Sequence, residues 1–526
     1  MPKLWPVALL LTTAAGALAA QAPASRGDAW WAHVEALAND GMEGRLTGSP
    51  GHQRAADYIV KQLTAIGLKP AGVNGFYQPV ALIDQSFIAA ESSAALVGPA
   101  GEMPLAVPTD VYFRGGPMPE TVDAPLVFAG YGLHIPEAGY DDFKGLDLKG
   151  KVVVVLSGGP ADISGALKSS ARSERGKYLA EQGAVGVIAL TTPKQVEIPW
   201  TRQVLLSSAP SMFFADPALR DVATPLMAAT LDVAKAPLLF AGAKLSFDEL
   251  SALSDASKPV PTFALTPRFK AKIVARRKAV ASTNLVAKLP GSDPKLAAEH
   301  VVLSAHFDGL GVGQPINGDA IYNGALDNAS GVASLLEIAK TLTASKVKPK
   351  RSILFTFVTG EEKGLLGSRY FAKRPSVPAA SLVADLNFDM ALPIFALKAV
   401  TPLGYEESSL GTDAKAVSAE MGLPILPDPF PDRNTFIRSD QYSFIREGIP
   451  ALFFKYGFTA GTPEAAAEKA WRANIYHSPA DDLKQPVMKE EAVKLDDYVA
   501  ALALRVANGA ARPAWNEASF FKRFVK

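Results

Sequence analysis

The chain has 526 residues, of which 48% are hydrophobic and 20% are charged, as is typical of a folded globular protein. This length exceeds one ordinary domain core, so we expect two or three domains. Lysine and arginine together number 53 and acidic residues 52, for a formal net charge of +1. Such a balance offers no bulk attraction to nucleic acid or to an anionic membrane surface, and we expect neither as a partner.

The first residues have the order of a secretory signal peptide. Lys3 precedes an apolar run over residues 4–11, and small residues follow up to Ala19. We expect cleavage after Ala19, which makes residues 1–19 a signal segment. The run is shorter than the roughly 20 apolar residues that span a bilayer, so we expect no membrane span after cleavage.

The sequence contains no cysteine, which excludes disulfides, thiol catalysis and cysteine metal sites. A large exported protein without disulfides is typical of bacteria, so we predict a periplasmic or extracellular location. The sequence leaves open which of the two applies, and also the oligomeric state.

Two helices are predicted near the start, at residues 28–37 and from residue 55 to residue 63, with a loop rich in glycine and proline at 43–51 between them. From about residue 110, short β-rich runs such as 126–129 and 152–156 alternate with turns. We interpret this part as a separate, mostly-β module that closes near residue 261.

Strands and helices alternate beyond residue 280. Apolar strands are predicted at 301–304, 353–358, 382–386 and 451–454, and a helix at 330–342. This alternation indicates an α/β domain with a largely parallel sheet. The predicted division of the chain is therefore a first segment of the α/β domain at 20–109, an inserted module at 110–262, and a second segment of the α/β domain at 263–526.

Polar residues follow the strand at 301–304. Alternation along an extended chain places His306 and Asp308 on the same side, where Asp308 could fix the tautomer of a metal-bound His306. Alone, this spacing is a weak signal and is more often structural. Asp327 and Asn328 lie between small residues that admit close backbone approach, which a simple helix cap does not explain.

Further acids and a second imidazole occur at comparable places. Glu361 and Glu362 follow the strand at 353–358, Asp389 ends the strand that starts near Leu382, and His477 lies in a loop beyond the strand at 451–454. Open α/β sheets bind ligands at the carboxyl ends of their strands.

Five carboxylates would therefore meet in one cleft. Two like charges about 4 Å apart repel by about 4 kcal/mol even at an effective dielectric constant of 20. Protonation or bound cations must relieve this repulsion, and carboxylates with two imidazoles suit zinc or a related ion. Without cysteine, such a ligand set is typical of a catalytic site.

The ordered motifs at residues 306–308, 324–331, 359–362, 387–390 and 477–482 resemble those of the M28 family of zinc peptidases. The resemblance covers about residues 28–105 and 265–500. It implies a three-layer α/β sandwich around a mostly parallel mixed sheet. The middle of the chain resembles the protease-associated domain that several members carry, through its runs at 128–132 and 147–152.

The resemblance implies five ligands for two zinc ions: His306 and Asp389 for one ion, Glu362 and His477 for the other, and Asp327 bridging both. The implied activity is a two-zinc aminopeptidase, an exopeptidase that removes N-terminal residues from peptides by a metal-bridging hydroxide.

Two further residues receive roles from the same resemblance. Asp308 would orient His306, and Glu361 would be the general base and then the general acid. A cis peptide bond is implied between Asp327 and Asn328. Gln441 departs from the family, which often has histidine there, so the substrate pocket is less well defined than the metal site.

Other functions remain open. A glutamate-carboxypeptidase-like enzyme would need a cationic pocket, for which Arg438 or Arg446 could serve, and a glutaminyl cyclase would use one zinc ion. A non-catalytic binding protein is disfavoured because all five ligands and Glu361 are present. No Gly-x-Ser-x-Gly motif surrounds Ser439 or Ser478, which argues against a serine hydrolase.

Overall fold

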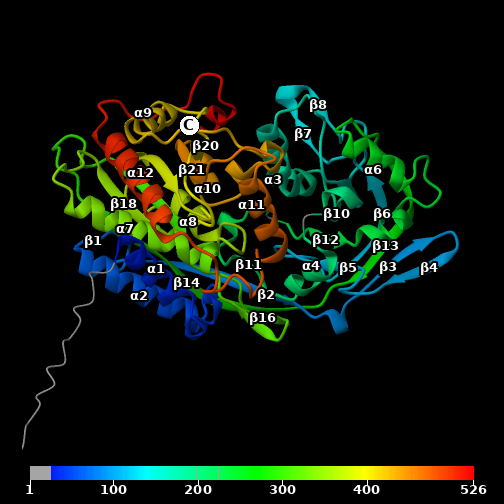
Figure 1. Cartoon of the computed structure of the whole chain (residues 1–526). Coiled ribbons are helices and arrows are strands. Elements are labelled where there is room, and N and C mark those ends of the chain that lie inside the picture. Colours follow the sequence, from blue (N-terminus) through cyan, green and yellow to red (C-terminus); the bar gives the residue numbers. More distant parts are fainter. Residues whose placement is uncertain (1–24, 197, 223, 526) are drawn as a thin grey trace, which may run out of the picture.

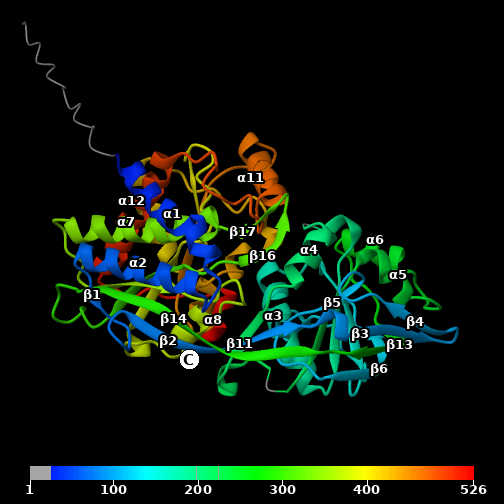
Figure 2. The same ribbon diagram turned by 90° about the horizontal axis from the view of Figure 1, so that it is seen from below.

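The computed structural model describes residues 25–525 apart from residues 197 and 223. The predicted signal segment at 1–19 lies outside the described residues. Two mixed sheets, each with its own hydrophobic core, form two bodies that lie side by side (Figures 1 and 2). Among the described helices, none is long and apolar enough to cross a membrane.

The larger sheet is mixed, and its four central strands β18, β15, β19 and β21 are parallel. The strands on either side of this group are antiparallel to their neighbours. In spatial order the sheet contains β11 (Ser211–Phe214), β2 (Tyr77–Phe87), β14 (Ala275–Leu289), β18 (Ser352–Val358), β15 (His300–His306), β19 (Leu382–Asn387), β21 (Ala451–Tyr456) and β20 (Val400–Leu403), and β1 (Lys69–Pro70) pairs with β14.

Helices cover both faces of this sheet. One face carries a group of mutually packed helices, α1 (Arg26–Ala38), α2 (Pro50–Ile66), α7 (Ser330–Ala344), α9 (Leu410–Met421) and α12 (Lys489–Asn508). The other face carries α8 (Leu366–Lys373) and α10 (Gln441–Ile445), and α11 (Pro463–Asn474) lies near the second body (Figure 1). The predicted three-layer α/β sandwich is confirmed.

Burial of the central strands on both faces explains their continuous apolar sequences. Val301 and Leu303 of β15 belong to the core under α1, α7 and α12, whereas Val302 packs in the core under α8 and α10. Side chains of successive strand residues point to opposite faces, so a strand between two helical layers needs an apolar residue at every position.

The second sheet also combines parallel and antiparallel strands. Its spatial order is β4 (Gly101–Leu105), β3 (Ser93–Gly98), β13 (Phe263–Lys272), β6 (Thr121–Phe128), β9 (Val152–Leu156), β10 (Gly186–Leu190), β12 (Met227–Leu231) and β5 (Val111–Phe113). The same stretch of chain contains α3 (Gly165–Glu181), α4 (Trp200–Ser207), α5 (Ala236–Leu239) and α6 (Phe247–Asp255).

We call this second body the inserted module. Its strands lie between Ser93 and Lys272, so they extend beyond both sides of the predicted segment 110–262. That division of the chain stays a prediction, as does the assignment of the module to the protease-associated domains. Two small hairpins complete the described strands, β7 (His134–Ile135) with β8 (Tyr140–Asp141), and β16 (Gly311–Ile316) with β17 (Asp319–Tyr322).

The two bodies are joined by more than a linker. β2 pairs with β14 over its whole length, and β14 follows directly on β13 of the second sheet. In addition, β11 leaves the inserted module and pairs with β2 at the edge of the larger sheet. The backbone hydrogen bonds of these strand pairs fix the inserted module to the larger sheet.

An ion-pair cluster reinforces the contact between the bodies. Asp221 of the inserted module lies 2.7 Å from Arg369 and 3.4 Å from Arg446. Burial raises the pKa of Asp221, but the two arginines outweigh it and lower that pKa below its usual value. The cluster therefore holds a charged carboxylate between α8 and the end of α10.

Replacing Asp221 should loosen this contact. Asp221→Asn leaves two partly buried arginines without their counter-charge, and we expect a loss of about 1–2 kcal/mol in the free energy of unfolding. Urea denaturation followed by tryptophan fluorescence measures the change. Asp123→Asn is the matched control, because Asp123 pairs with Arg268 at a side chain that is 60% exposed and such pairs contribute little. Equal effects of the two substitutions would contradict a bracing role for Asp221.

Candidate metal centre

The sequence-predicted ligands arrive from adjacent strand ends. His306 is the last residue of β15, Asp389 follows the end of β19, and Glu362 follows the end of β18. These three strands are neighbours in the sheet, so their carboxyl ends lie at the same edge. Asp327 comes from a π-helical turn at Ala325–Ala329, immediately before α7, and His477 from the loop after α11.

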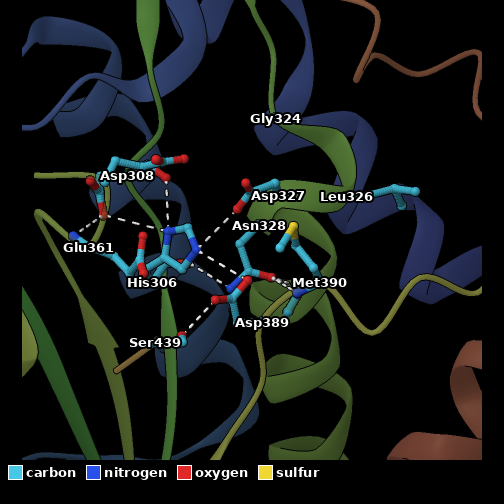
Figure 3. A network of polar contacts seen from close by, with 12 residues as sticks. His306, Asp308, Gly324, Leu326, Asp327, Asn328, Glu361, Asp389, Met390 and Ser439 are labelled. Carbon is cyan, nitrogen blue, oxygen red and sulfur yellow. Dashed lines mark hydrogen bonds and ion pairs between the residues drawn. The ribbon is translucent and has the colours of Figure 1, made fainter. Parts of the chain in front are cut away.

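The five side chains form two groups that share Asp327. In the first group, His306 Nε2 lies 3.3 Å from Asp327 Oδ1 and 3.6 Å from Asp389 Oδ1, as Figure 3 shows. In the second, His477 Nε2 lies 3.3 Å from Asp327 Oδ2 and 3.3 Å from Glu362 Oε2.

These separations fit ligands that surround a metal ion. Nitrogen and oxygen ligands about 2.0–2.1 Å from a tetrahedral zinc ion are about 3.4 Å from one another. Two buried ligand atoms, His306 Nε2 and Asp389 Oδ1, have no hydrogen-bond partner among the described residues. Asp327 turns one oxygen to each group, as a carboxylate that bridges two ions must do. The residues present therefore fit a pair of divalent ions.

The geometry at Asp327 depends on its backbone. The predicted cis peptide bond between Asp327 and Asn328 is present. Asp481 accepts hydrogen bonds from the backbone N–H groups of Leu326 and Asp327, both at 2.9 Å. Asn328 is also anchored, since its side chain donates to the Phe388 carbonyl at 2.9 Å and accepts from Gly331 at 3.0 Å. The bridging carboxylate is thus held from both sides.

Asp308 lies behind the first group and is fully buried. Its carboxylate accepts from the Thr47 hydroxyl at 2.9 Å and from the backbone N–H of Glu361 at 3.2 Å. His306 Nδ1 lies 3.3 Å from the Asp308 carbonyl oxygen and 3.7 Å from its carboxylate (Figure 3). The His306 ring therefore contacts Asp308 mainly through the main-chain carbonyl of Asp308. The Asp308 carboxylate instead holds the backbone N–H of Glu361.

Glu361 stands next to both groups without belonging to either. Burial raises the pKa of its carboxyl group; His306 opposes this, and the negative charges of Asp389 and Glu362 raise the pKa further, so that it lies well above its usual value. A carboxylate whose pKa is raised toward neutrality is suited to accept and return a proton.

Three residues to which the sequence analysis gave no role at the site also stabilise it through hydrogen bonds. Ser439 donates to Asp389 Oδ2 at 2.6 Å, and the Lys455 ammonium donates to the Asp389 carbonyl at 2.5 Å. Arg45 is buried and donates to the carbonyls of Phe307 and Gly324, which flank His306 and Asp327 along the chain. Arg45 lies in the loop at 43–51 that is rich in glycine and proline, whereas Lys455 is a strand residue without a local signal.

The residues left outside the predicted site have structural partners. His52 bonds to Thr359 at 2.9 Å, and His300 to Ser381 at 2.9 Å. Gln441 is fully buried and links Asn387 to the Phe436 carbonyl, so it fills a place in the core. Arg446 is engaged by Asp221.

A pocket opens beside the first group. It encloses about 510 Å³ of space, part of it open to solvent, and it begins at Met390, the residue after Asp389. Its walls are largely apolar, with Met390, Leu392, Phe395, Phe430, Tyr456 and Phe458. Lys455, Asp428 and an ion-paired group of Arg433, Glu468 and Arg472 line the rest.

Comparisons with known proteins find relatives of the part of the chain that carries this site. Residues 284–503 match the model of peptidase family M28, a range that includes all five ligand residues. A protein named probable leucine aminopeptidase 2 from Aspergillus oryzae is 31% identical over 238 residues, which are 42% of this chain and 44% of that protein. Leupeptin-inactivating enzyme 1 from Streptomyces exfoliatus is 29% identical over 214 residues, 38% of this chain and 43% of that protein.

The matched segment spans less than half the length of these two relatives. Among solved structures, the aminopeptidase from Aneurinibacillus sp. strain AM-1 superposes with a TM-score of 0.53 at 21% identity, over 93% of this chain and 94% of that one. At this identity the likeness supports the overall fold, including the inserted module.

Metal binding should release protons. Burial lowers the pKa of His306 and His477, but the carboxylates around them outweigh it and raise both pKa values above the usual one. The metal-free imidazoles therefore keep their protons to a higher pH than a free histidine does, and zinc must displace the protons that they carry. Calorimetric titration with zinc in two buffers of different ionisation enthalpy measures the number of protons released. We expect weaker binding as the pH falls from 8 to 6, and binding without proton release would contradict the assignment.

Proposed function

Because residues 284–503 form a peptidase family M28 domain, we propose that the chain is a zinc-dependent exopeptidase that removes N-terminal residues from peptides. The proposal places two zinc ions in the two ligand groups, with Asp327 as the shared ligand. Similar proteins include two named probable leucine aminopeptidase 2. Their names support peptides with a free N-terminal residue as the class of substrate.

The strongest support for the proposal is the arrangement of ligands around Asp327. The two oxygens of Asp327 face two different imidazoles at the same distance of 3.3 Å, and each imidazole has a second carboxylate beside it. A glutaminyl cyclase with one ion would need only one such group. The doubled arrangement favours a two-metal hydrolase.

The chain's own residues would move the proton and hold the substrate. Bound zinc supplies Lewis acidity, which polarises a carbonyl group and lowers the pKa of water. Glu361 would accept the proton of the attacking water and return it to the leaving amine. Asp308 would keep Glu361 in place through its hydrogen bond to the Glu361 N–H. Ser439 and Lys455 would fix Asp389 from behind.

The surroundings of the centre favour a substrate with a free amino group. Glu361, Asp389 and Asp440 are acidic and lie close together: beyond the effect of burial, Asp389 and Asp440 raise the pKa of Glu361, and Asp389 raises the pKa of Asp440. This negative potential attracts an N-terminal ammonium and repels a carboxylate. The apolar pocket that begins at Met390 would receive the side chain of the N-terminal residue. A carboxypeptidase that used Arg446 is disfavoured, because Asp221 already pairs with that arginine.

The proposal also includes export from the cell. It is supported by the signal-like order of residues 1–19 and by the absence of cysteine from the sequence. The role of the inserted module in shaping the cleft belongs to the same proposal, and its position beside α11 and the β16–β17 hairpin supports it.

Glu361→Gln tests the proposed base. The zinc-loaded protein should hydrolyse leucine 4-nitroanilide and leucyl peptides but not their N-acetylated forms. Glu361→Gln should lower kcat about 10³-fold, since general acid–base groups contribute 10²–10⁴-fold, and should keep its zinc by elemental analysis. The adjacent Glu362→Gln is the control, because it should lose zinc as well. Hydrolysis of N-acetylated peptides with free C-termini would instead indicate a carboxypeptidase.

The pocket makes a separate prediction. Phe458 forms edge-on ring contacts with Phe395 and Phe430 in the pocket wall. Phe458→Ala should lower kcat/KM for leucyl substrates about tenfold relative to alanyl substrates, since a lost apolar contact costs about 1–3 kcal/mol in discrimination. Val347→Ala, at an exposed site remote from the pocket, should leave the ratio unchanged. An unaltered ratio in Phe458→Ala would place the side-chain pocket elsewhere.

A further inference from the structure

The pocket beside the first ligand group contains one carboxylate that is not paired with a cation. Asp428 lines this pocket together with Met390, the residue after the ligand Asp389. Its Oδ1 atom accepts a hydrogen bond from the backbone N–H of Phe430 at 2.9 Å. Within the described part of the chain, Asp428 forms no ion pair, and its second oxygen accepts no hydrogen bond. One oxygen of this wall residue is therefore left for a bound molecule.

The other charged side chains of the pocket wall already have partners. Glu468 pairs with Arg433 at 2.9 Å and also with Arg472. The Lys455 ammonium donates to two backbone carbonyls beside the first ligand group, at 2.5 and 2.8 Å. Of the charged groups that line the pocket, Asp428 is thus the one best placed to bind a polar group of the substrate.

Asp428 lies at the side of the pocket away from the metal ligands. Asp389 follows β19, and Lys455 lies on the neighbouring strand β21 and pairs with Thr401 of β20. The Thr401 hydroxyl donates to the carbonyl of Leu426, in a segment that is bridged to β20 and reaches Asp428 two residues later. Three strand spacings of about 4.8 Å separate this segment from β19, together roughly 14 Å. Only a long side chain can therefore extend from the metal centre to Asp428.

The wall between these two ends favours an aromatic side chain. Phe395, Phe430, Tyr456 and Phe458 all line the pocket. The ring of Phe458 meets those of Phe395 and Phe430 edge-on, with centroids 5.7 and 6.0 Å apart. Aromatic rings attract one another in edge-on and offset arrangements beyond the effect of buried area. A substrate ring would find such partners along this wall.

The charges of the wall indicate that the occupant is neutral. Three cationic side chains line the pocket, Lys455, Arg433 and Arg472, against the two carboxylates of Asp428 and Glu468. This excess of positive charge disfavours the ammonium or guanidinium group of an N-terminal lysine or arginine. A carboxylate at the same place would face Asp428 and be repelled. A neutral hydrogen-bond donor meets neither penalty.

We propose that Asp428 accepts a hydrogen bond from the phenolic hydroxyl group of an N-terminal tyrosine, so that the enzyme prefers this residue to phenylalanine. This inference rests on the proposed aminopeptidase function and adds the substrate class to it. A hydrogen bond to a charged acceptor is roughly twice as strong as one between neutral groups. A substrate ring without the hydroxyl group would cover Asp428 and leave its free oxygen unpaired, which is the basis of strong discrimination.

The first test uses the zinc-loaded, unaltered protein. We expect kcat/KM to be about tenfold higher for tyrosine 4-nitroanilide than for phenylalanine 4-nitroanilide, as for one charge-assisted hydrogen bond. The 4-nitroanilide of O-methyltyrosine keeps the ring and the oxygen but cannot donate, and it should be no better than the phenylalanine substrate. A tyrosine-to-phenylalanine ratio of about one would overturn the inference, as would an O-methyltyrosine substrate that equals the tyrosine substrate.

A second comparison tests the charge of the occupant. Lysine and arginine 4-nitroanilides also carry long side chains with donors at the end, but these donors are cationic. Both should have a lower kcat/KM than tyrosine 4-nitroanilide, because the pocket wall has more cations than carboxylates. A higher value for either of them would overturn the assignment of a neutral donor.

Variants then assign the preference to one side chain. Asp428→Ala should reduce the tyrosine-to-phenylalanine ratio to about one. Asp428→Asn keeps an oxygen for the Phe430 N–H and should retain part of the preference. Asp232→Ala is the matched control, because Asp232 also accepts from the N–H two residues later, that of Ala234 at 3.1 Å, but does not line the pocket. Its ratio should equal that of the unaltered protein.

The outcomes separate the two proposals. Hydrolysis of the 4-nitroanilides with a ratio that Asp428→Ala leaves unchanged would overturn the role of Asp428 while the aminopeptidase function stands. Failure of the zinc-loaded protein to cleave any of these substrates, leucine 4-nitroanilide included, would overturn the proposed function itself.

Discussion

Electrostatic repulsion among the carboxylates around Asp327 is the constraint on which the rest of the site depends. Asp327, Glu362 and Asp389 converge on two imidazoles, and Glu361 and Asp308 stand directly behind them. Each pair of carboxylates about 4 Å apart costs about 4 kcal/mol at an effective dielectric constant of 20. Hydrogen bonds from Ser439 to Asp389 and from the Glu361 N–H to Asp308 relieve only part of this cost. Divalent cations held by these residues, as proposed above, would offset the remainder.

The larger sheet can hold these carboxylates close together because its strands are rigid and fix the loops that carry them. β18, β15 and β19 are adjacent, parallel and buried on both faces, so the residues that follow them emerge at fixed spacing. The loops are then fastened by groups that bear no metal-binding role: Asp481 under Asp327, Asp308 under Glu361, and Lys455 under Asp389. Ligands held in this way need little reorganisation when ions bind, which is the usual function of such supporting contacts.

The candidate ligand residues and the three-layer fold both have local signals in the sequence, and the fold could be predicted from them. Apolar strands ending in Asp, Glu or His indicate a sheet with a site at its edge, and motifs at 306–308 and 324–331 carry the family resemblance. Lys455 could not be found in this way, since it lies inside an ordinary strand and its role depends on which distant segments pack against it. The sheet of the module also includes strands outside the predicted segment 110–262, since β3 and β4 precede residue 110 and β13 begins at residue 263.

The attachment of the inserted module matters for how binding energy is used. Contacts made far from the reacting bond raise turnover only if they are rigid enough to hold that bond in place. A module on a flexible linker could contact a substrate but could not hold it in place. Here β11 pairs with β2, β14 continues from β13, and Asp221 forms ion pairs with two arginines. The inserted module is therefore held in a fixed position relative to the sheet that carries the candidate metal ligands.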